Sequence, residues 1–459
     1  MTLAILAIYL AAQFGLGYYI SIRIKTEDDY LIGGRSLGMG LATFSIFATW
    51  FGAETCIGAA GRVYEEGLSG GTHDPFGYGF CILAMGLFIA VPVWKLKLTT
   101  IGDLYRLRYS GLVERTAAII MIPTSLLWAA AQIRAFGQIL AAMSGVEVTI
   151  MITLAAIFII AYTFMGGLLA DAWTDLIQGI ALLTGLIILA FFLLFNHGVD
   201  LLRNVSVERL DLVNPQYALL DSLEAWSVPI LGSLVAAELI TRAIASRTAT
   251  IARNASILAF FIYVIIGIIP VLVGLIGPQD FAGLVHSEQI LPLVAEKYLP
   301  NILYVLFIGA LLSAIISTVD SALLTCGSLT SHNILLPVLK ARGYQINESK
   351  KVQFARRSVL VYGVVAYVMA LYAEGVYHLV EEASSFGSAG LVVVLFYALY
   401  AKSWSPIAAM FSLVGGVLSY IFCAHILILD HPFLISLLSA FLLYLTGQYF
   451  SPATKTSVL

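Results

Sequence analysis

The chain has 459 residues, of which 60% are hydrophobic and only 11% are charged, and its formal net charge is −3 at pH 7. This composition excludes a soluble globular domain, in which about 25% of residues are charged. The small net charge, without runs of like charge, argues against binding to nucleic acid. The sequence therefore predicts an all-α polytopic membrane protein, a multi-pass protein of the cell membrane.

The sequence lacks the motifs of ATP-driven pumps and membrane enzymes. It has no GxxxxGK[ST] loop to bind a nucleotide, and no hydrophilic stretch long enough to form a nucleotide-hydrolysing domain. We therefore expect a protein that is not an enzyme and that uses no nucleotide.

Thirteen apolar stretches are long enough, at about 20 residues each, to cross a bilayer as helices. The first lacks the basic start and the cleavage site of a signal peptide, so we expect it to be retained. The stretches lie near residues 3–22, 38–60, 76–94, 117–142, 148–167, 172–195, 226–246, 254–276, 301–333, 356–378, 384–401, 406–426 and 432–450.

The lysine and arginine residues predict the orientation of these spans. They gather after the first, third, seventh and ninth spans, whereas the connections 196–225 and 277–300 carry mainly acidic residues. By the positive-inside rule, the basic connections are cytoplasmic. With an odd number of spans, the N-terminus is then outside and the C-terminus inside.

Two of the predicted spans contain helix-breaking residues. Gly52, followed by Glu54, interrupts the second span, and Pro229 and Gly232 weaken the seventh. A simple kink explains each residue taken singly. The two breaks correspond, however, if spans two to six and seven to eleven are halves of opposite orientation. This pattern is typical of an inverted-repeat transporter with its site at the bilayer midplane.

The ninth span carries hydroxyl groups and a carboxylate within an apolar run. Ala314, Ser317, Thr318 and Ser321 recur at helical spacings of three and four residues, and Asp320 borders this stripe. Small and hydroxyl residues are also common at helix contacts in membranes. A carboxylate within the bilayer costs about 2.5–3.5 kcal/mol, so we favour a cation site over close packing alone.

Four stretches of the sequence resemble the sodium/solute symporter family. Their residues are Asp29–Gly38 (DYLIGGRSLG), Gly166–Gln178 (GGLLADAWTDLIQ), Ile240–Arg242 (ITR) and Ile316–Ser321 (ISTVDS). The resemblance implies a leucine-transporter-like core, a 5+5 inverted repeat of ten helices.

The resemblance also implies how the chain is divided. Residues 1–36 would form an extra N-terminal span and its connection, and residues 37–402 the ten-helix core. Within the core, residues 37–195 would form the first repeat and residues 226–402 the inverted second repeat. Residues 403–459 would add two C-terminal helices.

Members of this family carry proline, sugars, pantothenate, sialic acid and other small solutes. The resemblance implies Na⁺-coupled import of a small solute by alternating access, with Na⁺ as the coupling ion and the lipid bilayer as the surroundings. A monomer is compatible with this function. The alternatives are an H⁺-coupled symporter, a carrier of sugars or other solutes with the same fold, and a transporter-like membrane sensor.

Residue by residue, the resemblance implies a principal Na⁺ site. Its ligands would be the carbonyl oxygens of Ala48, Phe51 and Ala314 and the hydroxyls of Ser317 and Thr318. A shell of five uncharged oxygens suits a hard monovalent cation better than a divalent ion, which prefers several carboxylates.

The resemblance also implies a second site, formed by Asp175, Asp320 and Ser321. Members with such a site can have a serine where this chain has Asp320. Two facing carboxylates could bind a second Na⁺, or they could share a proton because like charges disfavour double ionisation. We expect the two carboxylates to lie close together.

Four residues are candidates for contact with the solute: Thr55, Asp74, Glu54 and Arg134. Thr55 stands where sugar carriers have an amide, so a sugar is not the favoured ligand. Arg134 stands near the position of a carboxylate-binding arginine in a sialic-acid carrier. This predicts a carboxylate or amino acid substrate, with Asp74 holding the amine of an amino acid. The alternative is an internal pair of Arg134 with Glu54 or Asp74.

Overall fold

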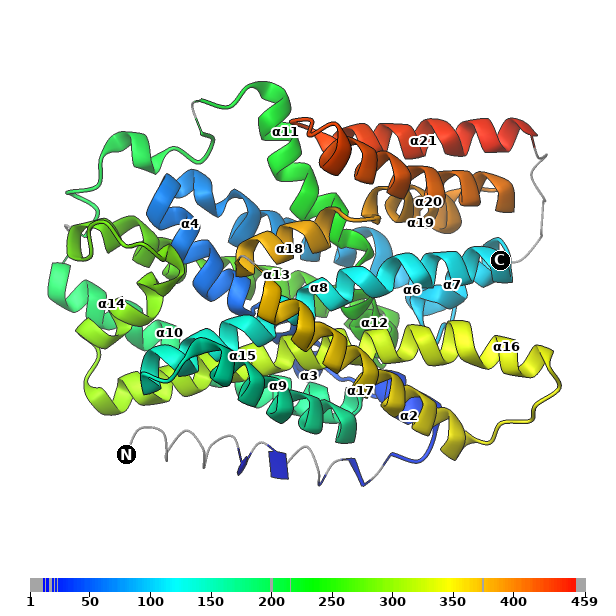
Figure 1. The fold of residues 1–459 in the computed structure, drawn as a ribbon, viewed down its shortest axis with the longest axis horizontal. Helices are drawn as coiled ribbons and strands as arrows, with labels where there is room; N and C mark the ends of the chain where they lie inside the picture. Colours follow the sequence, from blue (N-terminus) through cyan, green and yellow to red (C-terminus); the bar gives the residue numbers. More distant parts are fainter. Residues whose placement is uncertain are drawn as a thin grey trace.

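The computed structural model describes residues 24–450 apart from 199, 200, 215 and 374, together with residues 11, 12, 14, 15, 19, 21 and 22. The described residues form helices joined by connections, without a β-sheet (Figure 1). One isolated parallel bridge joins Leu37, just before α3, to Ser246, just after α12. The prediction of an all-α fold is confirmed.

Helical elements follow one another along the whole described chain. In the first half they are α2 (Glu27–Ile32), η1 (Gly33–Arg35), α3 (Met39–Trp50), η2 (Glu54–Gly58), α4 (Ala59–Glu66), η3 (Leu68–Gly71), η4 (Thr72–Gly77), α5 (Tyr78–Ala84), η5 (Met85–Ile89), α6 (Ala90–Lys95), α7 (Ile101–Arg108), α8 (Gly111–Ser144), α9 (Val148–Met165), α10 (Leu168–His197) and η7 (Val207–Leu210).

In the second half they are α11 (Leu219–Ser227), η8 (Val228–Gly232), η9 (Ser233–Val235), α12 (Ala237–Ala245), α13 (Ala249–Asp280), η10 (Ser287–Gln289), α14 (Ile290–Tyr298), α15 (Asn301–Ser328), η11 (Leu329–Leu335), α16 (Leu336–Ala341), α17 (Glu348–Tyr372), α18 (Val376–Ser385), α19 (Ser388–Tyr400), α20 (Pro406–Ile421), η12 (Phe422–Ile426) and α21 (Pro432–Phe450).

Nine helices of the described chain are long and apolar enough to cross a membrane, or eleven if each of two bent pairs is one span. The shorter helix α3, with η2 and α4, stands at the second predicted span. The first predicted span, residues 3–22, lies mostly outside the described residues. The number of thirteen spans therefore stays a prediction.

Three of the spans are broken near their middle. Helix α3 ends at Trp50, and Phe51 leaves the helical conformation at φ −92° and ψ 67°. The segment α11–η9 meets α12 at an angle of 49°, and α18 meets α19 at 42°. The sequence indicated the first two breaks. The third falls at Gly387, whose φ of 70° is disfavoured for residues with a side chain.

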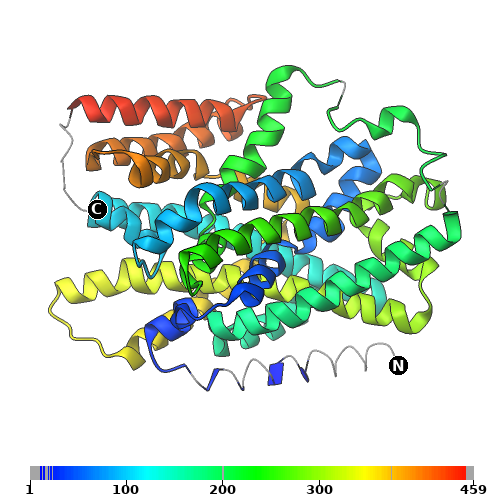
Figure 2. The ribbon, with the colours of Figure 1, turned by 180° about the vertical axis from the view of Figure 1, so that it is seen from behind.

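The broken helix α3 lies at the centre of the packing. It contacts α10, α12, α13 and α15, and the long helix α8 packs against α15, α17 and α18. Figure 2 shows α13 running alongside α5 and α6 on the other face. Helices α20 and α21 pack together at one edge, against α19 (Figure 1). Helix α3 thus packs among three unbroken helices, α10, α13 and α15, and against α12 of a bent span.

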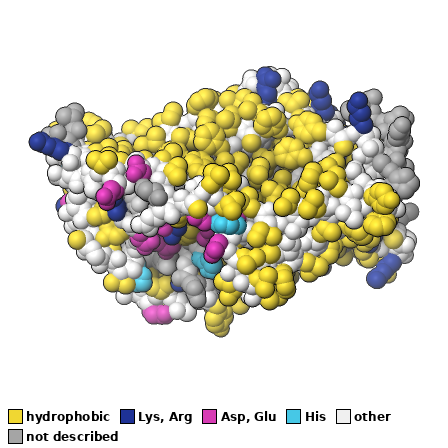
Figure 3. Space-filling view, turned by 90° about the horizontal axis from the view of Figure 1, so that it is seen from above, with side chains coloured by type: hydrophobic (Ala, Val, Ile, Leu, Met, Phe, Trp, Pro, Cys, Tyr) yellow, Lys and Arg dark blue, Asp and Glu magenta, His cyan; other side chains and the backbone are white. Residues whose placement is uncertain are grey.

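On the face seen in Figure 3, the exposed charged side chains lie mostly toward the two ends of the molecule. Figure 3 shows a broad hydrophobic surface, with most lysine and arginine side chains toward one end and acidic and histidine side chains toward the other. A hydrophobic belt of this kind fits a bilayer, whose apolar core excludes charges. The asymmetry agrees with the predicted orientation, which itself remains a prediction.

Candidate functional site

The stripe on α15 faces the break in α3. The Thr318 hydroxyl lies 3.5 Å from the Ala48 carbonyl oxygen and 3.2 Å from that of Ala314, and its side chain is 3% exposed. Carbonyls at a helix end lack intrahelical partners, so the end of α3 leaves oxygens free to bind a ligand. Two of the other four oxygens predicted for the principal Na⁺ site therefore lie within hydrogen-bonding distance of the Thr318 hydroxyl, itself the fifth.

Gly52 makes this close approach possible. A Cβ atom at this position would lie 2.7 Å from the Thr318 Oγ1 and 2.8 Å from carboxyl and amide oxygens of Glu54 and Gln132. No side chain fits there without a shift of these groups. Phe51 directly follows α3, and its carbonyl oxygen is the other Na⁺ ligand predicted from this span. The residue is fully buried.

Ser317 connects the principal site with the predicted second site. Its hydroxyl donates a short hydrogen bond to the Asp175 carboxylate on α10. Ser45 on α3 donates to the other oxygen of Asp175 at 2.5 Å. Asp175 thus holds α3 and α15 together, and a cation at either site would change its surroundings.

Arg242 on α12 provides the positive charge of this region. Its guanidinium donates short hydrogen bonds to Asp171 and Ser321, and its Nη2 lies 3.9 Å from Asp175. Ser321 in turn donates to Asp171 at 3.0 Å. Sequence reasoning missed the pairing of Asp171 with Arg242. The signal was that Asp171 and Asp175, four residues apart, share one face of a helix.

Asp320 lies in the same cluster, beside the carboxyl of Asp171, but no hydroxyl, amide or guanidinium of the described residues donates to it. It is 1% exposed, and it interacts electrostatically with Asp171 and Asp175. Thr163 lies nearby, but its hydroxyl donates to the Ile159 carbonyl at 3.0 Å, so both carboxyl oxygens of Asp320 accept no hydrogen bond from the described residues. Three carboxyl groups therefore lie in one cluster, and the Arg242 guanidinium lies within 4 Å of only Asp171 and Asp175, so the cluster holds more acidic than basic side chains.

Thr55 and Asp74 lie together in a hydrogen-bonded group. The Thr55 hydroxyl donates to one oxygen of Asp74 at 2.7 Å, and the hydroxyl of Tyr263, on α13, donates to the other at 3.0 Å. Both oxygens of this buried carboxyl are therefore engaged within the protein. Tyr263 was not singled out from the sequence, because nothing there shows that α13 contacts η4.

Glu54 joins the broken span to α8. Gln132 donates to its Oε2 at 2.5 Å and accepts from the Ala53 backbone at 2.9 Å. The other oxygen, Oε1, has no partner among the described residues. Arg134 points elsewhere, because its Nη1 donates to the Ala370 carbonyl at 3.0 Å and its charge lies near Glu288.

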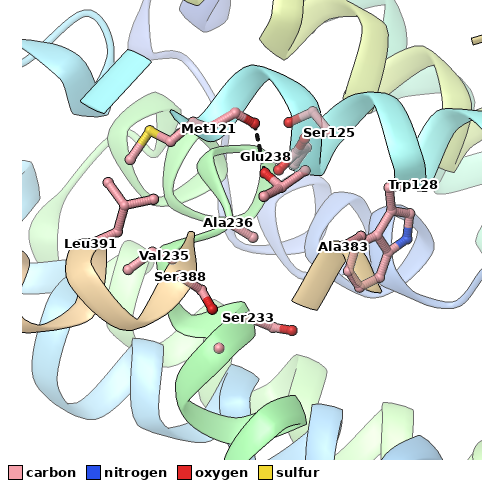
Figure 4. Close-up of a pocket in the computed structure, with 12 residues that line it drawn as sticks. Met121, Ser125, Trp128, Ser233, Val235, Ala236, Glu238, Ala383, Ser388 and Leu391 are labelled. Atoms are coloured by element: carbon pink, nitrogen blue, oxygen red, sulfur yellow. Dashed lines mark hydrogen bonds between the residues drawn. The ribbon is translucent and has the colours of Figure 1, made fainter. Parts of the chain in front are cut away.

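A small cavity lies between α8 and the breaks η9–α12 and α18–α19 (Figure 4). Its volume is about 20 Å³, which is room for one water molecule. Ser125 and Trp128 of α8, Ser233 and Glu238 of the seventh span, and Ser388 of α19 are among its lining residues. The four predicted solute contacts are not among them.

The sequence matches the model of the Sodium:solute symporter family over residues 30–416. The chain belongs to this family. It is 27% identical to the human high affinity choline transporter 1, over 86% of this chain and 70% of the relative. It is 25% identical to the Haemophilus influenzae sodium/pantothenate symporter (96% and 95%), and 26% identical to the Bacillus subtilis osmoregulated proline transporter OpuE (91% and 88%).

Some relatives are longer than this chain. The chain spans 59% of the Drosophila melanogaster high-affinity choline transporter 1, with 26% identity over 77% of its own length. The relatives are transporters and not enzymes, which agrees with the prediction.

Solved structures of transporters share the fold. A Na⁺-coupled sialic acid symporter in a substrate-bound outward-open state superimposes with a TM-score of 0.87 at 20% identity, covering 100% of this chain and 99% of the other. A nucleobase-cation-symport-1 family transporter in a closed conformation gives a TM-score of 0.63 at 15% identity, over 91% and 93%. The predicted family, leucine-transporter-like fold and multi-pass membrane class are confirmed.

Proposed function

We propose that this protein is a Na⁺-coupled symporter that imports a small solute by alternating access. The observation that carries the proposal is the meeting of the Ala48 and Ala314 carbonyls with the Thr318 hydroxyl at the break in α3. Together with Phe51 and Ser317, these groups would form the principal Na⁺ site. Membership of the sodium:solute symporter family supports the same function.

One Na⁺ ion is sufficient to drive accumulation. Its entry down a potential of about 100 mV releases about 2.3 kcal/mol, and a tenfold concentration gradient adds about 1.4 kcal/mol. Together these terms correspond to a solute gradient of several hundredfold. No energy source beyond the ion gradient is then needed.

We propose that Asp175, Asp320 and Ser321 form a second cation site, or that its carboxyls share a proton. The support is the buried Asp320, whose oxygens accept no hydrogen bond from the described residues, beside two further carboxyls. A cation or a proton there would offset the excess negative charge. Asp171 and Arg242 belong to this proposal because Ser321 donates a hydrogen bond to Asp171, and Asp171 is paired with Arg242.

The solute predicted from the sequence is a carboxylate or an amino acid, contacted by Arg134, Asp74, Thr55 and Glu54. The proline and pantothenate transporters among the relatives support this class, whereas the choline transporters carry a cation. A carboxylate would have to compete with the Ala370 carbonyl for Arg134. Asp74 would have to exchange a hydrogen bond from Thr55 or Tyr263 for one from an amine.

The test is uptake by purified protein in proteoliposomes. Radiolabelled choline, proline and pantothenate are offered separately, with an inward Na⁺ gradient, an inward K⁺ gradient or a pH gradient. We expect a Na⁺ gradient to drive accumulation of at least one solute. Accumulation driven only by the pH gradient would favour the H⁺-coupled alternative, and binding without uptake would favour a sensor.

A further inference from the structure

The cavity beside Trp128 has one ionisable side chain in its lining, the carboxyl of Glu238. Glu238 is 9% exposed, and its Oε1 accepts no hydrogen bond from the described part of the chain. Figure 4 shows its carboxyl beside Ser125, near the edge of the cavity. Ser125 interacts with this carboxyl, but a buried carboxylate without a positively charged partner is still costly, so Glu238 calls for a positive group that the cavity lining does not contain.

Arg242 does not supply this positive group, although it follows Glu238 by one helical turn. Its Nη1 donates to the backbone carbonyl of Glu238 at 3.2 Å and its Nε to Ser45 at 3.3 Å. Its Nη2 donates to Asp171 and Ser321. The guanidinium is thus directed toward the acidic cluster, and it forms no ion pair with the side-chain carboxyl of Glu238, which it reaches only through a longer-range electrostatic interaction.

Aromatic rings form the adjoining wall. The ring of Trp128 lies 5.6 Å from that of Trp50 and 5.6 Å from that of Tyr78, and the latter two rings are 5.4 Å apart. Trp128 also interacts with the carboxyl of Glu54, which accepts a hydrogen bond from Gln132. An ammonium group over an aromatic face gains about 0.5–2 kcal/mol, most strongly with tryptophan.

We propose that this cavity receives a positively charged nitrogen of the transported solute, with Glu238 as its counter-ion and Trp128 as its aromatic wall. The inference rests on the symport function proposed above and narrows the solute to organic cations and to zwitterions with a cationic nitrogen. The hydroxyls of Ser125, Ser233 and Ser388 offer hydrogen bonds to the rest of the solute. The lining contains no lysine, arginine or histidine that would attract an anion.

In this structure the cavity, at about 20 Å³, is too small to hold a solute such as choline or proline. Two of its walls, η9–α12 and α18–α19, belong to the bent spans. Relative motion of these segments would widen the cavity, and broken helices at the midplane commonly border the solute in transporters of this architecture. The proposal therefore assigns the cavity to the closed form of the solute site.

The test measures the melting temperature of the purified protein in Na⁺ or K⁺, with added choline, tetramethylammonium, proline, pantothenate or acetate. A ligand that binds the folded state raises the melting temperature. We expect choline, tetramethylammonium or proline to do so in Na⁺, and pantothenate and acetate to have no effect. Glu238→Gln should weaken this binding by about tenfold or more, because it removes a charged partner. It should also raise the melting temperature without ligand, because it removes an unpaired buried charge.

Matched variants separate this role from a general loss of charge or structure. Glu296→Gln makes the same change on the exposed face of α14 and should leave solute binding unchanged. Trp128→Phe should retain more affinity for tetramethylammonium than Trp128→Leu, because it keeps an aromatic face.

Three results would overturn the inference: stabilisation by pantothenate or acetate alone, no stabilisation by any of the nitrogen cations, and unchanged binding in Glu238→Gln. The stabilising effect of Na⁺ without solute is scored separately. If Na⁺ alone does not raise the melting temperature of the wild-type protein, the result counts against the symport proposal. If Na⁺ stabilises the protein but one of the three results above is obtained, only the assignment of this cavity is wrong.

Discussion

Asp171 and Asp320 occupy one cluster but differ in their partners. Asp171 accepts hydrogen bonds from Arg242 and Ser321, whereas Asp320 accepts none from the described residues. We predict that Asp171→Asn destabilises the protein by about 3–5 kcal/mol, because it removes the carboxylate that is hydrogen-bonded to a buried guanidinium and leaves only Asp175, at 3.9 Å, as a charged neighbour. Thermal melting in detergent measures the effect.

The matched variant is Asp320→Asn. It removes a carboxylate that accepts no hydrogen bond from a hydroxyl, amide or guanidinium of the described residues. It should leave the melting temperature unchanged or raise it, while altering the dependence of transport on Na⁺ or pH. Equal destabilisation by the two variants would show that Asp320 is held by a partner within the protein, and the second-site proposal would fail.

Arg134 can be tested by a substitution that keeps its charge. Arg134→Lys loses the planar fork that binds a carboxylate through two hydrogen bonds. If Arg134 contacts the solute as predicted, the affinity for proline falls by about tenfold while Na⁺ binding is kept. A lower melting temperature with unchanged affinity would show instead that its bond to Ala370 is structural.

At the residue scale, the sequence could predict the hydroxyl stripe but not its partners. Ser317 and Thr318 were recognisable because helical spacing places them with Ala314 on one side of a helix. The pairing of Arg242 with Asp171 could not be predicted from spacing, because they lie on different helices, 71 positions apart. The cavity at Glu238 was missed for the same reason, since it is built from α8, α12 and α19.

At the scale of elements, the break in α3 depends on the absence of a side chain at Gly52. A Cβ there would meet the Thr318 hydroxyl at 2.7 Å. We predict that Gly52→Ala costs about 1–3 kcal/mol through overpacking and weakens the apparent affinity for Na⁺. Na⁺-dependent thermal stability measures both effects.

The control is Gly40→Ala in the same helix, where a Cβ would meet nothing within 4 Å. Because alanine favours a helix over glycine by about 0.5–1 kcal/mol, this variant should be neutral or stabilising and should bind Na⁺ normally. If both variants bind Na⁺ as the wild type does, the close approach at Gly52 has no part in the ion site.

Apolar length predicted the elements well wherever one helix crosses the protein in a single piece. Helix α9, for example, spans Val148–Met165 where a span near 148–167 was expected. The bend between α18 and α19 was missed because no proline marks it, and Gly387 alone is an ambiguous signal. Helix α14 was also missed. Its nine residues are too few to cross a bilayer, and they lie in a connection that is too polar to be predicted as a span.

At the scale of the whole molecule, the predicted orientation can be tested by cysteine labelling. Val285→Cys, in a connection predicted to be external, should react with a membrane-impermeant maleimide in intact cells. Tyr344→Cys, in a connection predicted to be cytoplasmic, should react only after permeabilisation. Both positions are exposed, and the native residues Cys56, Cys81, Cys326 and Cys423 are buried, so the background should be low. The reverse pattern would contradict the orientation.

The central claim is that the oxygens around Thr318 bind the Na⁺ that drives transport. Its most direct test is a Na⁺ titration of the melting temperature of wild-type protein, Thr318→Ala and Ser317→Ala, at constant ionic strength with K⁺ as the replacement. We predict stabilisation by Na⁺ but not K⁺ in the wild type, and an apparent affinity lowered by about tenfold or more in each variant, because one of few ligands is lost. Unchanged Na⁺ affinity in both variants would contradict the claim and would leave the stripe as helix packing.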